Sequence, residues 1–402
     1  MRPRTDAAGV AASAWVRIAL IYLAARTATT GFFLLAGALA APGSRVGSDG
    51  GLGAFVVAWD AQWYWLIAVA GYPAELPLTE TGQVAENAWA FLPVFPHVAA
   101  VVGLPFGSWP VGAFVVSLAA GYLACVVLFA LLRERMDAVA ATWAVVFFAA
   151  APLSPLLQVG YAESLFLLLL LLGIRCVVRR RYAWLFVLVP VMGFTRPGVL
   201  AFALFLGLVG ILRFVRRRSD ALPPREIAAI VAAGAVASIV GFAWPVIAAL
   251  ATGSPTAYFD TEGAWRRTWT GEEAGFVPFE GWMQGARFWV ETVWGAPPGW
   301  GVVVAVVVVA AVAALLLFEP HVRRLGAELR LWAASYLIYL VAVFLPQSSI
   351  FRLLLPLSPL WGAAALPRSL WWRGGVLVAC LIGQWWWIWN MYGQGVAFWQ
   401  IP

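Results

Sequence analysis

The feature that most constrains this chain is its series of uncharged apolar runs, several of which are long enough to cross a lipid bilayer. The run at residues 299–318 is one example, and a transmembrane α-helix needs about 20 such residues. Hydrophobic residues make up 63% of the 402 residues and charged residues only 11%, which is too little polar surface for a soluble domain of this size. We therefore expect an all-α polytopic membrane protein.

About eleven stretches are expected to span the membrane, with the N-terminus on the cytoplasmic side. They lie at about residues 15–41, 109–132, 138–153, 161–178, 182–195, 197–215, 226–251, 299–318, 329–346, 351–366 and 372–392. Most arginines then fall in cytoplasmic loops, as the positive-inside rule requires. Counting residues 91–107 as a span would break that pattern, so we predict an interfacial or re-entrant element there.

Two segments expected on the outer side, at about residues 42–108 and 252–298, are too long to be simple connectors and hold most of the acidic residues. Long loops in compact proteins are often functional. The sequence shows no internal repeat, unlike transporters that are built from repeats. We expect residues 1–402 to form a single membrane-embedded domain.

The basic residues are all arginine, and the net charge is +7. Their position in short loops favours topology signals over nucleic-acid binding, so we expect membrane lipids and no nucleic acid as partners. The abundance of Ala, Gly, Val and Trp is typical of a GC-rich genome, which indicates a bacterial plasma membrane. The three cysteines lie within apolar runs and the two histidines are far apart, so we predict no metal site.

The stretch VAWDAQWYWLIAVAGYP places one carboxylate, Asp60, among three tryptophans. From Trp59 to Tyr72 the pattern predicts a short helix in the membrane surface, because tryptophan prefers the headgroup region. The spacing places Asp60, Tyr64 and Ile67 on one face of that helix. The simplest interpretation is that Asp60 only caps the helix.

The same stretch resembles a motif of the PIG-V type mannosyltransferases and their bacterial relatives, which are integral-membrane glycosyltransferases of the GT-C class. The matching pairs are Trp59-Asp60, Trp63-Tyr64, Ile67-Ala68 and Gly71-Tyr72. Four further stretches resemble elements of that family in the same order: FLPVFP at residues 91–96, GYAESLFLLLLLLG at 160–173, GFTRPGVL at 193–200 and FRLLLPLSPLW at 351–361. The chain departs from the family at Ala58, where eukaryotic members usually carry arginine, and at the Pro-Gly pair after Arg196.

The resemblance implies transfer of a sugar from a polyprenyl-phosphate donor on the outer face, usually with inversion. Mannose is the expected sugar, with arabinose or another sugar left open, and the acceptor is a glycolipid, a glycan or a protein hydroxyl. The reaction needs a base for the acceptor hydroxyl and cationic groups for the departing phosphate. Asp60 is the expected base, because a partly desolvated carboxyl group has a raised pKa.

Arg352 and Arg196 are expected to bind the donor phosphate, with an ion pair to Glu163 or Asp60 as the alternative. His97 is a further candidate phosphate ligand, or else an ordinary interfacial histidine. The expected substrate-binding residues are Glu163, Tyr64, Trp59, Trp63 and Tyr161.

No cofactor is expected, and a divalent metal is not favoured. Arg26, in the middle of the first span, should bind a buried partner or a helix carbonyl. Arg266 and Arg267 are expected to face water, with binding of lipid headgroups as the alternative. Two other classes of function stay open, namely a transporter or flippase of lipid-linked sugars and a non-catalytic lipid-binding protein.

Overall fold

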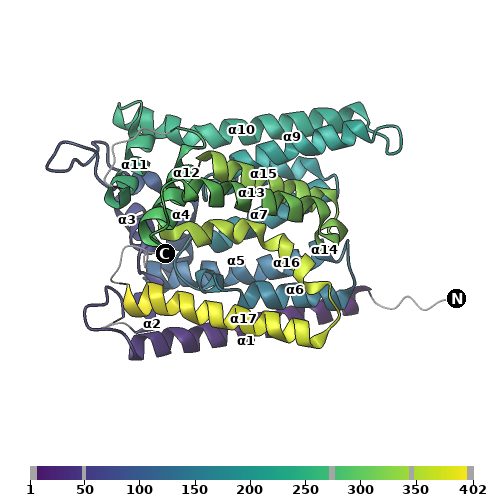
Figure 1. Cartoon of the computed structure of the whole chain (residues 1–402), viewed down its shortest axis with the longest axis horizontal. Coiled ribbons are helices and arrows are strands. Elements are labelled where there is room, and N and C mark those ends of the chain that lie inside the picture. The colour runs from purple at the N-terminus through teal and green to yellow at the C-terminus, as the bar shows by residue number, and fades with distance from the viewer. Residues whose placement is uncertain (1–6, 48–50, 271–276, 344–347, 396–402) are drawn as a thin grey trace.

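The computed structural model describes residues 7–47, 51–270, 277–343 and 348–395, and these residues are all-helical (Figure 1). The α-helices are α1 (Ala7–Ala38), α2 (Leu52–Val56), α3 (Asp60–Ala70), α4 (Val94–Gly103), α5 (Trp109–Leu132), α6 (Ala138–Ala150), α7 (Glu163–Val178), α8 (Leu185–Gly193), α9 (Val199–Val215), α10 (Pro224–Thr252), α11 (Ala257–Thr270), α12 (Glu280–Arg287), α13 (Trp300–Phe318), α14 (Pro320–Arg324), α15 (Ala327–Val343), α16 (Trp361–Ala365) and α17 (Leu370–Ile388). The 3-10 helices are η1 (Ala88–Ala90), η2 (Leu104–Phe106), η3 (Ser154–Leu157), η4 (Tyr182–Trp184) and η6 (Ser348–Leu360), and η5 (Phe288–Val293) and η7 (Trp389–Gln394) are π-helical. Within these ranges β-pairing is limited to an isolated bridge between Leu78 and Val84.

Four helices of the described ranges, α1, α5, α10 and α13, are long and apolar enough to cross a membrane. The outward faces of such helices are apolar: on α13, Val303 is 49% exposed and Val306 and Val307 are each 60% exposed. Apolar faces of this extent are stable in lipid and unfavourable in water. The described chain therefore has the surface of a membrane-embedded helical protein.

Helices lie at the positions of the expected spans, with one exception. The stretch 351–366 is not one α-helix: it consists of the 3-10 helix η6 followed by the short α16. Pro356 and Pro359 lie inside η6, and each proline removes a backbone donor and crowds the preceding turn. The expectation of a regular α-helical span there is wrong.

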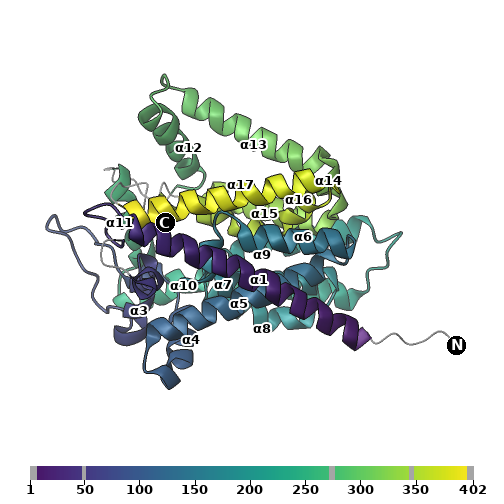
Figure 2. The same cartoon turned by 90° about the horizontal axis from the view of Figure 1, so that it is seen from below.

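The long helices run roughly along one axis and leave two distinct ends (Figures 1 and 2). The connection between α9 and α10 and the short helix α14 lie at one end, on the right of Figure 1. Helices α2, α3 and α11 lie at the opposite end. The two long segments expected on the outer side of the membrane therefore gather at the same end of the molecule.

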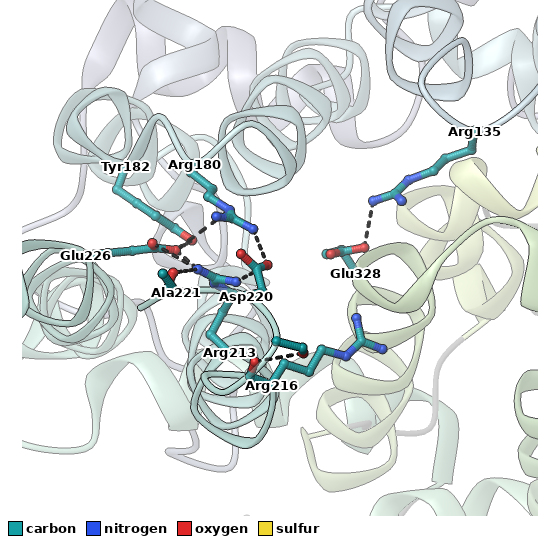
Figure 3. A network of polar contacts seen from close by, with 10 residues as sticks. Arg135, Arg180, Tyr182, Arg213, Arg216, Asp220, Ala221, Glu226 and Glu328 are labelled. Atoms are coloured by element: carbon teal, nitrogen blue, oxygen red, sulfur yellow. Dashed lines mark hydrogen bonds and ion pairs between the residues drawn. The ribbon is translucent and has the colours of Figure 1, made fainter. Parts of the chain in front are cut away.

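The end that carries the α9–α10 connection is rich in arginine, and we call it the arginine-rich end. One buried arginine there is bound by acidic partners (Figure 3). Arg213 of α9 is 6% exposed; its Nε lies 3.0 Å from Oε1 of Glu226 on α10, and its Nη1 binds Asp220 in the α9–α10 connection. Arg180 also pairs with Asp220, and the Tyr182 hydroxyl donates to Glu226 over 3.2 Å. The neighbouring arginines at positions 216–218 are exposed, so they keep the free charge that a topology signal requires.

Helix α4 packs very closely on α5, which ties the first outer segment to the bundle. A Cβ atom at Gly112 of α5 would lie only 2.0 Å from the Ala99 carbonyl oxygen of α4. The main hydrophobic core is rich in phenylalanine, with Phe147, Phe166 and Phe202 fully buried. This rigid packing supports the helix ends that carry the candidate site.

Candidate functional site

Four charged residues from distant parts of the chain meet at the end where the outer segments gather. Asp60 begins α3, Glu163 begins α7, Arg196 lies between α8 and α9, and Arg352 lies in η6. Nη1 of Arg352 binds Oδ2 of Asp60 and lies 3.8 Å from Oε1 of Glu163. Nη2 of Arg196 lies 3.3 Å from the same Glu163 oxygen. We call these four residues the charge cluster.

The charge cluster is largely withdrawn from solvent. Its side chains are 16% exposed at Asp60, 15% at Arg352, 10% at Arg196 and 3% at Glu163. A single charge at such a position would be costly, and the two carboxylates and two guanidinium groups compensate one another. Burial raises the pKa of the Asp60 carboxyl group, and the charge and hydrogen bond of Arg352 oppose that shift. The ion-pair alternative predicted for both arginines is therefore what the structure contains.

The backbone before Asp60 has an uncommon conformation. Trp59 has φ +57°, which is strained for a residue with a bulky side chain. Its indole Nε1 donates to the Met391 carbonyl over 3.0 Å, so contact with η7 stabilises that conformation. Trp59 occupies the N-cap position of α3, no side chain caps this helix, and the Asp60 carboxylate is bound by Arg352 instead. The interpretation of Asp60 as a helix cap alone is thus wrong.

Tyr161 joins the charge cluster from the connection between α6 and α7. Its hydroxyl oxygen accepts a hydrogen bond from the Asp60 backbone N–H over 3.3 Å. The Arg352 guanidinium carbon lies 5.7 Å from the centre of the Tyr161 ring, which is within the range of a cation–π contact. Beside it, the Gly160 N–H donates to the Val56 carbonyl over 2.9 Å, so this connection is attached to the first outer segment.

The other aromatic residues singled out on α3 pack against the segment around α4. Tyr64 is 5% exposed and contacts Phe91 and Phe95 edge to face, with ring centres 5.2 Å apart in each pair. Trp63 stacks on Phe91 at 5.9 Å. These residues form the wall that holds α3 in place next to the charge cluster.

His97 is set apart from this group. It is exposed on α4, and its Nδ1 lies 2.7 Å from the carbonyl oxygen of Pro93 on the preceding turn. His97 thus has a hydrogen-bond partner at the start of α4.

The second outer segment contributes contacts that the sequence reasoning missed. Helix α11 carries Glu262, whose carboxylate accepts a hydrogen bond from Tyr258 and lies within the electrostatic influence of Asp60 and Arg352. Burial raises the pKa of Glu262 to about 7. One signal was available: Glu262 precedes Trp265 by three residues, as Asp60 precedes Trp63.

The expectation that Arg266 and Arg267 face water is wrong. Arg266 is only 3% exposed and donates to the side chain of Gln284 on α12, and Arg267 donates to the Val84 carbonyl in the first outer segment. Both arginines therefore serve to dock α11 against its neighbours.

No protein-family model matches the chain, and no curated protein is significantly similar to it in sequence. The family resemblance therefore depends on the motif residues themselves. Within the described ranges, no three His, Cys, Asp or Glu side chains lie together as the ligands of a metal ion would.

Proposed function

We propose that this protein is a membrane-embedded glycosyltransferase of the GT-C class, related to the PIG-V type mannosyltransferases. It transfers a hexose, with mannose as the expected sugar, from a polyprenyl-phosphate donor to a hydroxyl acceptor on the outer face of a bacterial plasma membrane. The proposal includes the crossings, about eleven in number, that the sequence predicts. The observation that carries it is the contact among Asp60, Glu163, Arg196 and Arg352, which come from four separate family-like motifs.

In the proposed reaction Asp60 takes the proton of the acceptor hydroxyl as its oxygen attacks the anomeric carbon. The bond between that carbon and the phosphate oxygen breaks, and the lipid phosphate leaves with the bonding electrons. Arg352 and Arg196 stabilise the charge that develops on the phosphate. Arg352 retains a donor for this purpose, because its buried Nε has no hydrogen-bond partner in the described structure.

The pairing of Arg352 with Asp60 connects donor binding to the activation of the base. The Arg352 guanidinium lowers the pKa of Asp60 and so weakens it as a base. A donor phosphate that binds this guanidinium shares its positive charge, which frees the Asp60 carboxylate for the acceptor. The base then becomes effective when the donor is present.

The test is a transfer assay with protein purified into nanodiscs, radiolabelled polyprenyl-phosphate mannose and a membrane lipid extract. Asp60→Asn should lower the transfer rate at least about 100-fold, the usual contribution of a general base, while donor binding is retained. Glu75→Gln, an exposed acid of the same outer segment, is the matched control and should transfer normally. Transfer by Asp60→Asn at the wild-type rate would contradict the proposal.

The same purified protein, reconstituted in liposomes, separates the rival classes of function. A flippase moves the labelled lipid between leaflets and forms no new product. A lipid-binding protein retains the donor and does neither. Either outcome, with no labelled product from any membrane extract, would exclude the glycosyltransferase.

A further inference from the structure

Helix α11 of the second outer segment is docked on the first outer segment. The Asn87 side-chain amide donates to Thr261 Oγ1 over 2.9 Å in a buried contact. The Trp265 ring meets Trp63 at 5.7 Å and Phe91 at 5.8 Å, both edge to face. The two outer segments, far apart in sequence, therefore form one structure beside the charge cluster.

The two helices present the same pair of residue types at this contact. On α3, Asp60 lies three residues before Trp63, and on α11, Glu262 lies three residues before Trp265. Residues three apart lie on the same face of a helix. Because Trp63 and Trp265 touch, the carboxyl groups of Asp60 and Glu262 lie on the sides of α3 and α11 that face a common region. The electrostatic influence of Asp60 on Glu262 agrees with this placement.

Glu262 differs from the carboxylates of the charge cluster in its partners. Asp60 and Glu163 are each bound by arginine, whereas Glu262 accepts a hydrogen bond from the Tyr258 hydroxyl one turn earlier on α11. A carboxylate and a phenol next to a tryptophan ring are suited to carbohydrate. The oxygens bind ring hydroxyls, and the indole covers the apolar face of the sugar.

We propose that Glu262 and Tyr258 bind hydroxyl groups of a sugar ring at the charge cluster. The second outer segment then selects the sugar, and Asp60 and Arg352 act on the bond that reacts. This inference rests on the proposed glycosyltransferase function and adds to it the residues that determine specificity.

The experiment compares binding of polyprenyl-phosphate mannose with binding of methyl polyprenyl phosphate, a bare lipid that lacks the sugar. Both are phosphodiesters with one charge, whereas a phosphate monoester would gain a second charge at about pH 6. Wild-type protein should bind the mannose-bearing lipid more tightly. Glu262→Gln should reduce this preference about tenfold, the effect of losing a hydrogen bond to a charged group, and leave binding of the bare lipid unchanged. Glu262→Asp keeps the carboxylate and should restore part of the preference.

Asp260→Asn is the matched control on the same helix. Asp260 accepts a hydrogen bond from Thr256 and, two residues before Glu262, lies about 200° around the helix from it. It should behave as wild type in both binding and thermal unfolding. If a Glu262 variant unfolds at the same temperature as Asp260→Asn and still loses the preference for the mannose-bearing lipid, its fold is intact. That variant has then lost a contact with the ligand.

A second arm distinguishes a donor sugar from a sugar in the acceptor. If Glu262→Gln keeps the lipid preference and raises KM for the acceptor about tenfold at unchanged kcat, the bound hydroxyls are those of the acceptor, and the inference holds. If the lipid preference and the acceptor KM both equal those of wild type, the inference is wrong and the proposed function stands. If wild-type protein binds neither lipid, both fail.

Discussion

The Glu262 carboxyl group titrates in the physiological range, because burial raises its pKa to about 7. The Tyr258 hydrogen bond and the Arg352 charge oppose this shift, the Asp60 charge adds to it, and Tyr339 of α15 also faces the group. Below pH 7 the carboxyl group is neutral, and above it the group is a carboxylate whose two oxygens both accept hydrogen bonds from a sugar.

We therefore expect the preference for the mannose-bearing lipid to increase as the pH rises from 6 to 8 through about 7. The measurement is the ratio of the two lipid affinities across this pH range, made both in the wild-type protein and in an Asp60→Asn background in which Asp60 does not titrate. Because the Asp60 charge raises the pKa of Glu262, the midpoint should be lower in the Asp60→Asn background than in the wild-type protein. Glu262→Gln in that background should make the ratio independent of pH. A profile that is unchanged by the Glu262 substitution would show that another group titrates.

Among the elements, the connection between α6 and α7 depends on a residue of α1. The Arg26 guanidinium, 5% exposed in the middle of α1, donates to the Ser154 carbonyl over 2.5 Å and to the Ala149 carbonyl over 2.6 Å. These contacts confirm that its partner is a helix carbonyl. The same connection continues to Tyr161 and Glu163, so Arg26 stabilises the segment that delivers two site residues.

Replacing Arg26 by leucine should lower the free energy of unfolding by roughly 2–4 kcal/mol, because buried carbonyl groups lose their donors. Thermal unfolding followed by tryptophan fluorescence in detergent measures this change. Arg17→Leu is the control on the same helix, since Arg17 is exposed and contacts only the Phe129 ring among the contacts described. Equal unfolding temperatures for the two variants would contradict the role assigned to Arg26.

At the scale of the whole molecule, the two ends should face opposite sides of the membrane. Thr81 and Ser219 are exposed at the two ends and suit cysteine labelling. In a Cys176→Ala background, with Cys125 and Cys380 buried, a membrane-impermeant maleimide should modify Thr81→Cys in intact cells. Ser219→Cys should react only after the cells are permeabilised, because the positive-inside rule places the arginine-rich end in the cytoplasm. The reverse pattern would invert the proposed orientation.

Hydropathy and motif residues were enough to predict the helical membrane class, the positions of the long helices and the four residues of the charge cluster. Hydropathy and the distribution of arginine are local properties that each segment carries regardless of its neighbours. The prolines of η6 were also visible in the sequence, and the regular helix predicted there ignored the donors that they remove.

Which of these charges meet depends on how the chain folds. Asp60 and Arg352 are 292 residues apart, and the docking of α11 through Thr261 and Trp265 brings Glu262 to the same region. Such pairs depend on how helices pack, and a charged side chain has no preference for a particular partner until packing excludes water around both. For this reason the burial of Arg266 and the pairing of Glu262 with Tyr258 belong to the folded chain and were not predicted from the sequence.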